Sequence, residues 1–150
     1  MHIRAPSPVN VVTVSKVMNK KTLEKRMREL EIYSDFCLRK EIKVLAGVLQ
    51  ENEILNCILT GVHDGNRKML AVTDQRVAVI FSAALGGGEV KVIRGEAVKD
   101  YEFVKKLLFS SARIATAEEN MVFTNTQGSL GPLFLWAMER LTGKSNHNNG

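Results

Sequence analysis

The sequence has few of the residues from which catalytic and metal sites are built. Its three histidines, His2, His63 and His147, are placed in an arm, a turn and a tail, too far apart in sequence for a local metal site. Cys37 and Cys57 lack metal-ligand spacing, and no adjacent base would activate either thiol. No set of acid, base, nucleophile and metal ligands is visible. We therefore predict that the protein is not an enzyme and needs neither cofactor nor metal.

Long apolar runs are also missing. No segment approaches the roughly 18 uninterrupted apolar residues that span a bilayer. The N-terminus has no apolar segment and cleavage site of the kind that defines a signal peptide. Gly86-Gly87-Gly88 lacks the Lys-Ser/Thr ending of a phosphate-binding loop and predicts a hairpin turn. The missing membrane-spanning segment and signal peptide, together with two cysteines interpreted as reduced, predict a cytoplasmic protein.

What the chain does contain is enough apolar sequence for one globular domain. It has 150 residues, of which 45% are hydrophobic and 25% charged. The net charge is +5, and residues 1–43 hold ten Lys and Arg against five Asp and Glu. Residues 44–150 hold eleven of each sign. The basic excess therefore belongs to the N-terminal third, and the remaining domain is neutral.

The first third predicts two helices. Residues 1–18 form an arm with two interpretations, a loose, disordered segment or a short edge strand. Asn19 is a suitable N-cap for a basic helix over residues 20–33. We place the segment that contains this helix at residues 19–35. Asp35 is expected to cap a second helix over residues 36–49, whose apolar positions follow helical spacing.

From Glu53 onward the apolar period falls toward two, which is typical of strands. The strands are expected over residues 54–62, 69–72, 77–81, 90–94, 98–104, 107–116 and 121–124. The residues predicted to form their core are Leu55, Ile58, Leu70, Val72, Val79, Phe81, Val92, Phe103, Ile114 and Phe123. Ser129 is expected to cap a last helix over residues 130–141, and residues 143–150 read as a disordered tail.

Seven short strands and a closing helix predict a small barrel or split sandwich covered at one end. Five segments of the chain are similar to those of a known family of domains. They are Lys40-Glu41-Ile42-Lys43-Val44-Leu45, Leu49 to Leu55, Gly61 to Gly65, Thr73-Asp74-Gln75-Arg76 and Lys105-Lys106-Leu107-Leu108-Phe109. In these the chain resembles the bacterial pleckstrin-homology-like domains of the YokE-like family, over residues 38–141. It departs at Ser110-Ser111, where that family often has a glycine. The resemblance implies a pleckstrin-homology-like domain over residues 36–142 and leaves the arm and the first helix outside it. The predicted fold class is therefore α+β, a small antiparallel β-barrel of about seven strands with a C-terminal capping helix and two N-terminal helices.

Thr73-Asp74-Gln75-Arg76 has two interpretations, a polar functional cluster or turn chemistry. We favour the turn, with Thr73 bonded back to the backbone and Arg76 paired with a carboxylate along the barrel wall.

Two surfaces are candidates for binding. The first is the basic cluster, with Lys20, Lys21, Lys25, Arg26 and Arg28 as anion-binding residues. Its alternative is a solvated helix face. The second surface is on the last helix, where Leu135, Trp136 and Met138 are left over after one apolar stripe is buried. Either the N-terminal helices cover them, or they bind a partner or a second copy.

We therefore predict a non-enzymatic binding or adaptor module whose partner is a protein, with self-association also possible. The alternative is a peripheral binder of anionic surfaces, membrane or nucleic acid, through the basic helix. A fold of this kind does not itself define the ligand.

Overall fold

The fold is α+β, and a computed structural model describes residues 17–36, 39–82 and 88–145. Most of the predicted arm, tail and three-glycine turn lies outside the described residues, as do His2, Cys37 and His147. The helices are α1 (Lys20–Glu29), α2 (Tyr33–Phe36), α3 (Glu41–Val48) and α4 (Gly131–Thr142).

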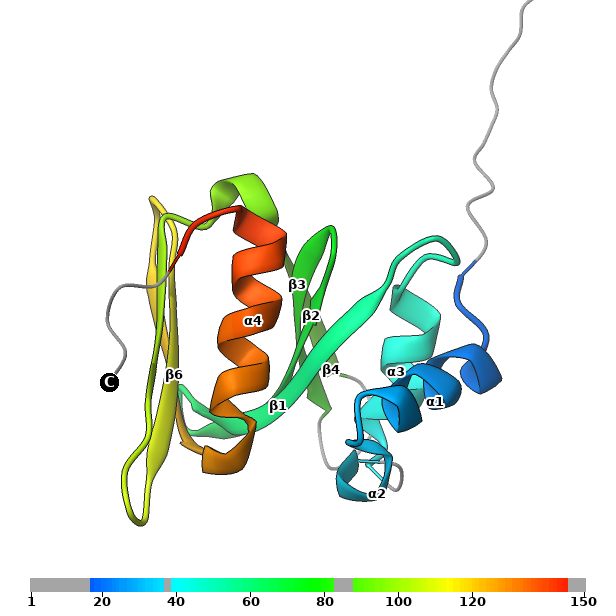
Figure 1. The fold of residues 1–150 in the computed structure, drawn as a ribbon, viewed down its shortest axis with the longest axis horizontal. Helices are drawn as coiled ribbons and strands as arrows, with labels where there is room; N and C mark the ends of the chain where they lie inside the picture. Colours follow the sequence, from blue (N-terminus) through cyan, green and yellow to red (C-terminus); the bar gives the residue numbers. More distant parts are fainter. Residues whose placement is uncertain (1–16, 37–38, 83–87, 146–150) are drawn as a thin grey trace, which may run out of the picture.

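A single antiparallel sheet holds the seven strands, in the order β4-β3-β2-β1-β7-β6-β5. The strands are β1 (Leu55–His63), β2 (Asn66–Thr73), β3 (Arg76–Ser82), β4 (Gly88–Arg94), β5 (Asp100–Val104), β6 (Ser110–Ala115) and β7 (Asn120–Thr126). The sheet curls around α4, and β4 and β5 stand at its two ends (Figure 1). The predicted architecture is confirmed, with the correction that the barrel is open rather than closed.

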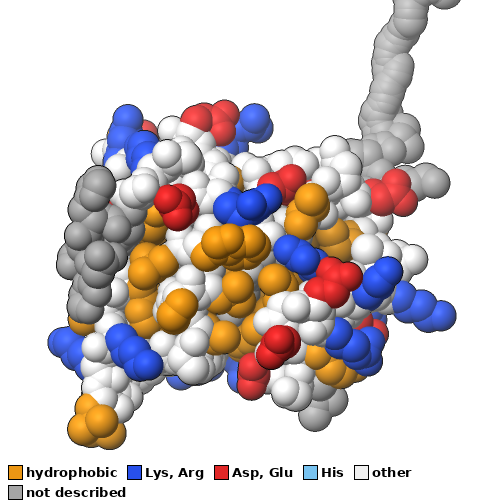
Figure 2. All heavy atoms as spheres, in the orientation of Figure 1, with side chains coloured by type: hydrophobic (Ala, Val, Ile, Leu, Met, Phe, Trp, Pro, Cys, Tyr) orange, Lys and Arg blue, Asp and Glu red, His pale blue; other side chains and the backbone are white. Residues whose placement is uncertain are grey.

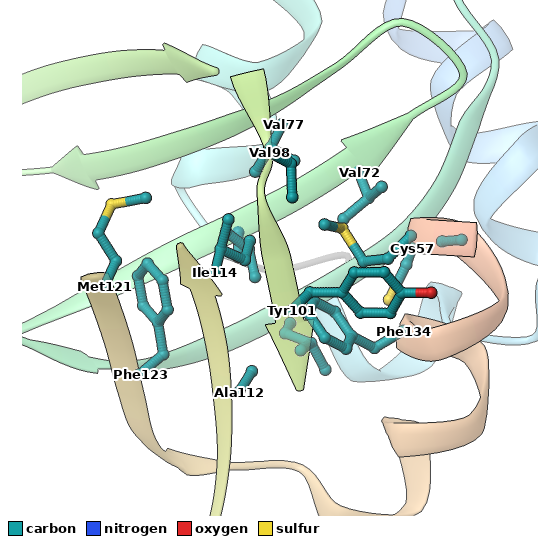
Figure 3. Close-up of a cluster of buried hydrophobic side chains, with 14 of the residues drawn as sticks. Cys57, Val72, Val77, Val98, Tyr101, Ala112, Ile114, Met121, Phe123 and Phe134 are labelled. Atoms are coloured by element: carbon teal, nitrogen blue, oxygen red, sulfur yellow. The ribbon is translucent and has the colours of Figure 1, made fainter. Parts of the chain in front are cut away.

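The inner face of the curled sheet and α4 enclose the first of two apolar cores (Figure 3). The ring of Phe134 on α4 lies 6.4 Å from that of Tyr101 and 6.0 Å from that of Phe103, centroid to centroid. Met138 on the next turn of α4 is fully buried in the same core. Alternate residues of the strands supply the rest, as expected for a sheet with one buried face.

The outer face of β1–β3 forms a second core with the N-terminal helices. Leu23 and Met27 of α1 are buried there against strand residues such as Ile58 and Ile80. Figure 1 shows β1 and β2 lying between α4 and the N-terminal helices. Of the two alternatives for the last helix, cover by the N-terminal helices of the same chain is therefore wrong, because both faces of the sheet are apolar and each helix layer packs on a different face.

The predicted N-terminal helices are shorter than expected. Asn19 caps α1 as predicted, with its Oδ1 accepting a hydrogen bond from the Thr22 amide at 3.1 Å. The helix then ends at Glu29 because Glu31 adopts a left-handed φ of 61° and the Ile32 amide bonds back to the Met27 carbonyl. A glycine usually marks such an end, so the sequence gives no signal here. The expected cap at Asp35 is also wrong, because Asp35 lies inside α2.

The last helix begins slightly differently from the prediction. A short 3-10 helix, η3 (Gly128–Leu130), leads into α4, so Leu130 and not Ser129 is the N-cap residue. No side chain caps this end, and Pro132 occupies the first turn, where its missing N–H costs nothing.

Eight of the ten predicted core residues are buried, and two are not. Val92 is 42% exposed because it lies on the end strand β4 and points to the outer face, whereas its neighbour Ile93 points inward. Phe81 is only partly buried, near the end of β3. The last error concerns the sixth strand, which begins at Ser110 and not at Leu107.

β1 and β7 meet at a tight corner where the two halves of the sheet join. A Cβ atom on Gly61 would lie 2.9 Å from the Thr124 carbonyl oxygen and 2.9 Å from Thr126 Cγ2, so only glycine fits. Beside it, the Thr60 amide donates to Gln127 Oε1 at 3.1 Å, and Gln127 Nε2 donates to Thr60 Oγ1 at 2.6 Å. Side chains thus supply hydrogen bonds where the corner interrupts the strand ladder.

Candidate functional site

The polar turn between β2 and β3 is occupied by internal bonds. Arg76 donates from Nε to Glu53 Oε2 at 2.9 Å and from Nη2 to Glu53 Oε1 at 2.7 Å. Thr73 Oγ1 donates to Glu53 Oε2 at 2.8 Å and accepts the amides of Gln75 and Arg76 at 3.0 Å each. The predicted structural role of this turn is confirmed, and Glu53 is the carboxylate partner.

The electrostatics of Glu53 agree with that role. Burial acts to raise the pKa of Glu53, but hydrogen bonds from Arg76, Gln50 and Thr73 outweigh it and hold the pKa below its ordinary value. The Glu53 side chain has no exposed surface. The ionised carboxylate is therefore a fixed part of the fold and not a group available to a ligand.

One predicted anion-binding residue on α1 has a structural role. Arg26 donates from Nε to the Leu55 carbonyl at 2.7 Å and from Nη2 to Asn56 Oδ1 at 2.9 Å, and its Nη1 lies 3.2 Å from Glu29 Oε1. These bonds attach α1 to the start of β1. Arg26 consequently has little capacity left for an external anion.

The other four basic residues lie on the exposed side of α1. The guanidinium of Arg28 stacks on the ring of Tyr33 at 3.9 Å from its centroid. The ammonium of Lys20 lies 3.8 Å from the carboxylate of Glu24, one helical turn later. Lys21 and Lys25 are exposed. The cluster predicted from the sequence is thus divided between structural contacts and a few solvated charges.

The three residues predicted for a contact surface on α4 are not equally accessible. Met138 is fully buried in the inner core, so its assignment to the surface is wrong. Leu135 is partly buried against the same core. Trp136 is 40% exposed, and the guanidinium of Arg140 lies 5.2 Å from its ring centroid. Only Trp136 offers appreciable apolar surface to a partner here.

A more exposed apolar surface lies at the turn between β5 and β6, which we call the β5–β6 tip (residues 105–109). Its exposed fractions are 98% for Leu107, 78% for Leu108 and 62% for Phe109. Lys105 and Lys106 precede them and are also exposed. Figure 2 shows an apolar projection at the lower left, bordered by basic side chains, where Figure 1 places this turn. Three adjacent large apolar side chains in water are unusual in a soluble domain.

The base of the β5–β6 tip is held by specific contacts. The Ser110 Oγ accepts a hydrogen bond from the Lys106 amide at 3.3 Å. A bulge follows, because Ser110 pairs with Thr126 but Ser111 pairs with Thr124, leaving Asn125 unpaired with φ of 56°. Bulges of this kind bend a strand and redirect the side chains beyond it. The tip is therefore a projection of the sheet whose base is fixed by a hydrogen bond and a β-bulge.

The sequence reasoning missed this surface because Leu107-Leu108-Phe109 was interpreted as the start of a strand. Two adjacent lysines followed by three consecutive apolar residues break the alternation of a half-buried strand. That break in periodicity was the available signal.

Among the hollows that the described residues line, four can be compared by the charges around them. The hollow beside the β5–β6 tip has a volume of about 450 Å³ and one charged residue, Lys106, with no acid. A hollow of about 200 Å³ at the end of the sheet near His63 is lined by Asp64, Glu89 and Glu119 as well as by lysines. The hollow beside α1 and the one beside β4 also contain acids. Of these four hollows, all lined by described residues, the tip hollow alone combines apolar walls with a single positive charge and no acid.

Two further properties bear on function. Among the described residues, no group of His, Cys, Asp and Glu side chains has the arrangement of a metal site. None of the helices in the described ranges has the length and apolar character needed to cross a bilayer.

Comparison with known proteins identifies the family of the chain. No curated protein matches the chain. A family model described as "Bacterial PH domain" matches residues 49–130, which run from the end of α3 through the sheet to the start of α4. Domains of this type are typically binding modules without catalytic activity, whereas the narrower YokE-like assignment stays a prediction. With more than half of its length matched and the expected sheet and capping helix in place, the chain belongs to the bacterial PH domain family.

Proposed function

We propose that this bacterial PH domain is a peripheral binding module that attaches to anionic lipid surfaces through the β5–β6 tip. One observation carries the proposal, namely the exposure of Leu107, Leu108 and Phe109 directly after two lysines. Such a segment places apolar side chains at the acyl boundary while the lysine ammonium groups reach the headgroups.

The energetics support reversible attachment. Moving an exposed Leu or Phe side chain fully out of water contributes roughly 1.5–3 kcal/mol. A lysine near an anionic leaflet contributes about 1 kcal/mol. Three apolar side chains and two lysines together are enough for peripheral binding, though not for the permanent insertion of a membrane-spanning helix.

The shape of the tip favours lipid over protein. A stable protein interface covers about 800 Å² on each partner and has an apolar centre surrounded by a polar rim. The β5–β6 tip instead projects from the end of a hairpin (Figure 2). Its neighbours Ser110, Ser111 and Thr124 are polar. A narrow projection of this type enters a soft lipid surface more readily than it matches a flat protein surface.

The experiment is co-sedimentation of the full chain with vesicles of phosphatidylcholine, alone or mixed with phosphatidylglycerol. We expect binding to the anionic vesicles and a loss of at least tenfold in affinity for the double variant Leu107→Ser/Leu108→Ser. Lys105→Glu/Lys106→Glu should weaken binding, with a strong dependence on salt.

Two matched controls separate this proposal from its alternatives. Lys21→Glu/Lys25→Glu makes the same change of charge on α1, and Val90→Ser/Val92→Ser removes exposed apolar surface from β4. Both should bind vesicles as the unmodified chain does. If only the α1 variant lost binding, the basic helix would be the contact. If the chain ignored vesicles but captured a protein in a tip-dependent way, the predicted protein-binding module would replace this proposal.

A further inference from the structure

We infer that β4 pairs with β4 of a second copy of this chain, as two antiparallel strands related by a two-fold axis at Val90. The inference goes beyond lipid attachment and shares no residue with the β5–β6 tip. Self-association is predicted from the sequence on α4, where the structure exposes Trp136 but buries Met138. The outer edge of β4 fits a second copy better, for the reasons that follow.

β4 has a strand partner on one side only. It is the last strand in the order of the sheet, and its ladder runs along β3, with Ser82 opposite Gly88 at one end and Arg76 opposite Arg94 at the other (Figure 1). No other described strand pairs with it. Six of its seven residues are exposed. The backbone amides and carbonyls on its outer edge are therefore available to an added strand.

This edge has few of the features that keep edge strands apart. Proline, a bulge or an unpaired lysine usually blocks the approach of another strand. β4 contains no proline, and its seven residue pairs with β3 follow one another without a shift of register. Its single lysine, Lys91, forms an ion pair with Glu119. Val90 and Val92 are 41% and 42% exposed, so the edge also offers apolar surface.

The charges of β4 select one register for the pair. A two-fold axis at Val90 places Glu89 opposite Lys91 of the second copy, and the same pair recurs on the other side of the axis. Val92 then lies opposite Gly88 of the second copy, which has no side chain. An axis at Glu89 or at Lys91 would place like charges opposite each other, which is destabilising. An axis at Val92 would give neither charge an opposite partner.

The occupant is a second copy because one short segment supplies both sides of the contact. Residues 88–92 are complementary to themselves, as an interface with two-fold symmetry requires. A pairing of this length covers less than the roughly 800 Å² on each partner that a stable interface needs. The association should therefore be weak, with a dissociation constant of roughly 10 μM to 1 mM.

Sedimentation velocity of the full chain across that concentration range tests the inference. The unmodified chain should pass from monomer to dimer. Val90→Lys places two ammonium groups together at the axis and should weaken the dimer at least tenfold. Val122→Lys, at a 39% exposed position on β7, is the matched control and should dimerise as the unmodified chain does.

A charge exchange separates pairing from damage to the fold. Glu89→Lys should weaken the dimer about tenfold, because it replaces both opposite-charge pairs with like charges. The triple variant Glu89→Lys/Lys91→Glu/Glu119→Lys reverses every sign of the set and should restore the dimer to within about threefold. Glu51→Lys, the same change at an exposed turn residue, should have no effect.

The inference is overturned if the unmodified chain stays monomeric throughout the range, or if Val90→Lys dimerises normally. It is also overturned if the triple variant stays as weak as Glu89→Lys, or if Trp136→Ser is the substitution that abolishes the dimer. Lipid attachment depends on other residues and is measured at lower protein concentration. Failure of either proposal therefore leaves the other standing.

Discussion

The β2–β3 turn and the β5–β6 tip connect neighbouring strands of one sheet, and their side chains behave in opposite ways. In the first, the polar groups of Thr73 and Arg76 bond to the buried carboxylate of Glu53. In the second, Leu107 and its two apolar neighbours contact mainly solvent. The first turn has the structural role that the sequence analysis favoured, whereas the apolar run of the second, predicted to start a strand, is an exposed surface. Residue type alone therefore misleads at turns, and the bonds that each side chain makes decide its role.

The comparison is tested most strongly by removing the charge of Glu53. Glu53→Gln leaves the guanidinium of Arg76 without its carboxylate in a largely buried position, and breaking a buried pair of this kind costs about 3–5 kcal/mol. Urea unfolding should show that loss. Glu51→Gln, two residues earlier and exposed, is the matched control and should change the free energy of unfolding by less than about 0.5 kcal/mol. Equal effects of the two variants would show that Glu53 is not part of the fold's support.

Thr73→Val should have the next largest effect. It removes the hydroxyl that donates to Glu53 and accepts two amides of the turn, and unsatisfied buried groups of this type cost about 1–3 kcal/mol. Thr124→Val, at an exposed position, makes the same chemical change and should be nearly neutral. A neutral Thr73→Val would mean that water replaces the hydroxyl and that the turn is less fixed than its bonds indicate.

The pH dependence of stability should come partly from the same carboxylate. Because the folded pKa of Glu53 is lowered, its stabilisation is complete above the unfolded value of about 4.3 and is lost as pH falls through the folded value. The difference in unfolding free energy between the unmodified chain and Glu53→Gln should therefore shrink on acidification. A difference that grew toward acid pH would contradict the direction of the shift.

The smallest effect on stability is expected at the tip. Leu107→Ser/Leu108→Ser should change the free energy of unfolding by less than about 0.5 kcal/mol, because neither side chain is packed in the fold. Thermal or urea unfolding measures this directly. A loss of about 2 kcal/mol or more, the range of a buried apolar truncation, would show that the tip is covered in solution and would end the contrast between the two turns.

Much of this architecture was predictable from the sequence, and the errors have physical causes. Strong periodicity and turn residues gave the seven strands and the order of helices, and the resemblance gave the curled sheet. Local pattern could not show that Glu31 would end α1 in a left-handed conformation without glycine, nor that the two faces of the sheet would each take a helix layer. Such outcomes depend on contacts between distant segments.

The candidate site was harder to predict for a related reason. A run such as Leu107-Leu108-Phe109 has the same composition in a core strand and at an exposed tip, and only the start of β6 at Ser110 separates the two. Arg26 shows the reverse error, because its charge suggested a ligand while its bonds to Leu55 and Asn56 attach α1 to the sheet. Composition therefore locates candidate surfaces, whereas long-range hydrogen bonds remove some of them.

The burial of Cys57 allows the opening of the domain to be followed by alkylation of one thiol. Its thiol lies in the inner core on β1, and burial raises the pKa of the thiol, so almost no reactive thiolate exists while the domain is closed. In a chain carrying Cys37→Ser, alkylation of Cys57 requires an excursion that exposes β1, and its rate then measures the population of open molecules. A lipid that binds only the closed domain lowers that population. Protection of one thiol from alkylation would thus give an affinity in solution, with no label placed on the lipid surface.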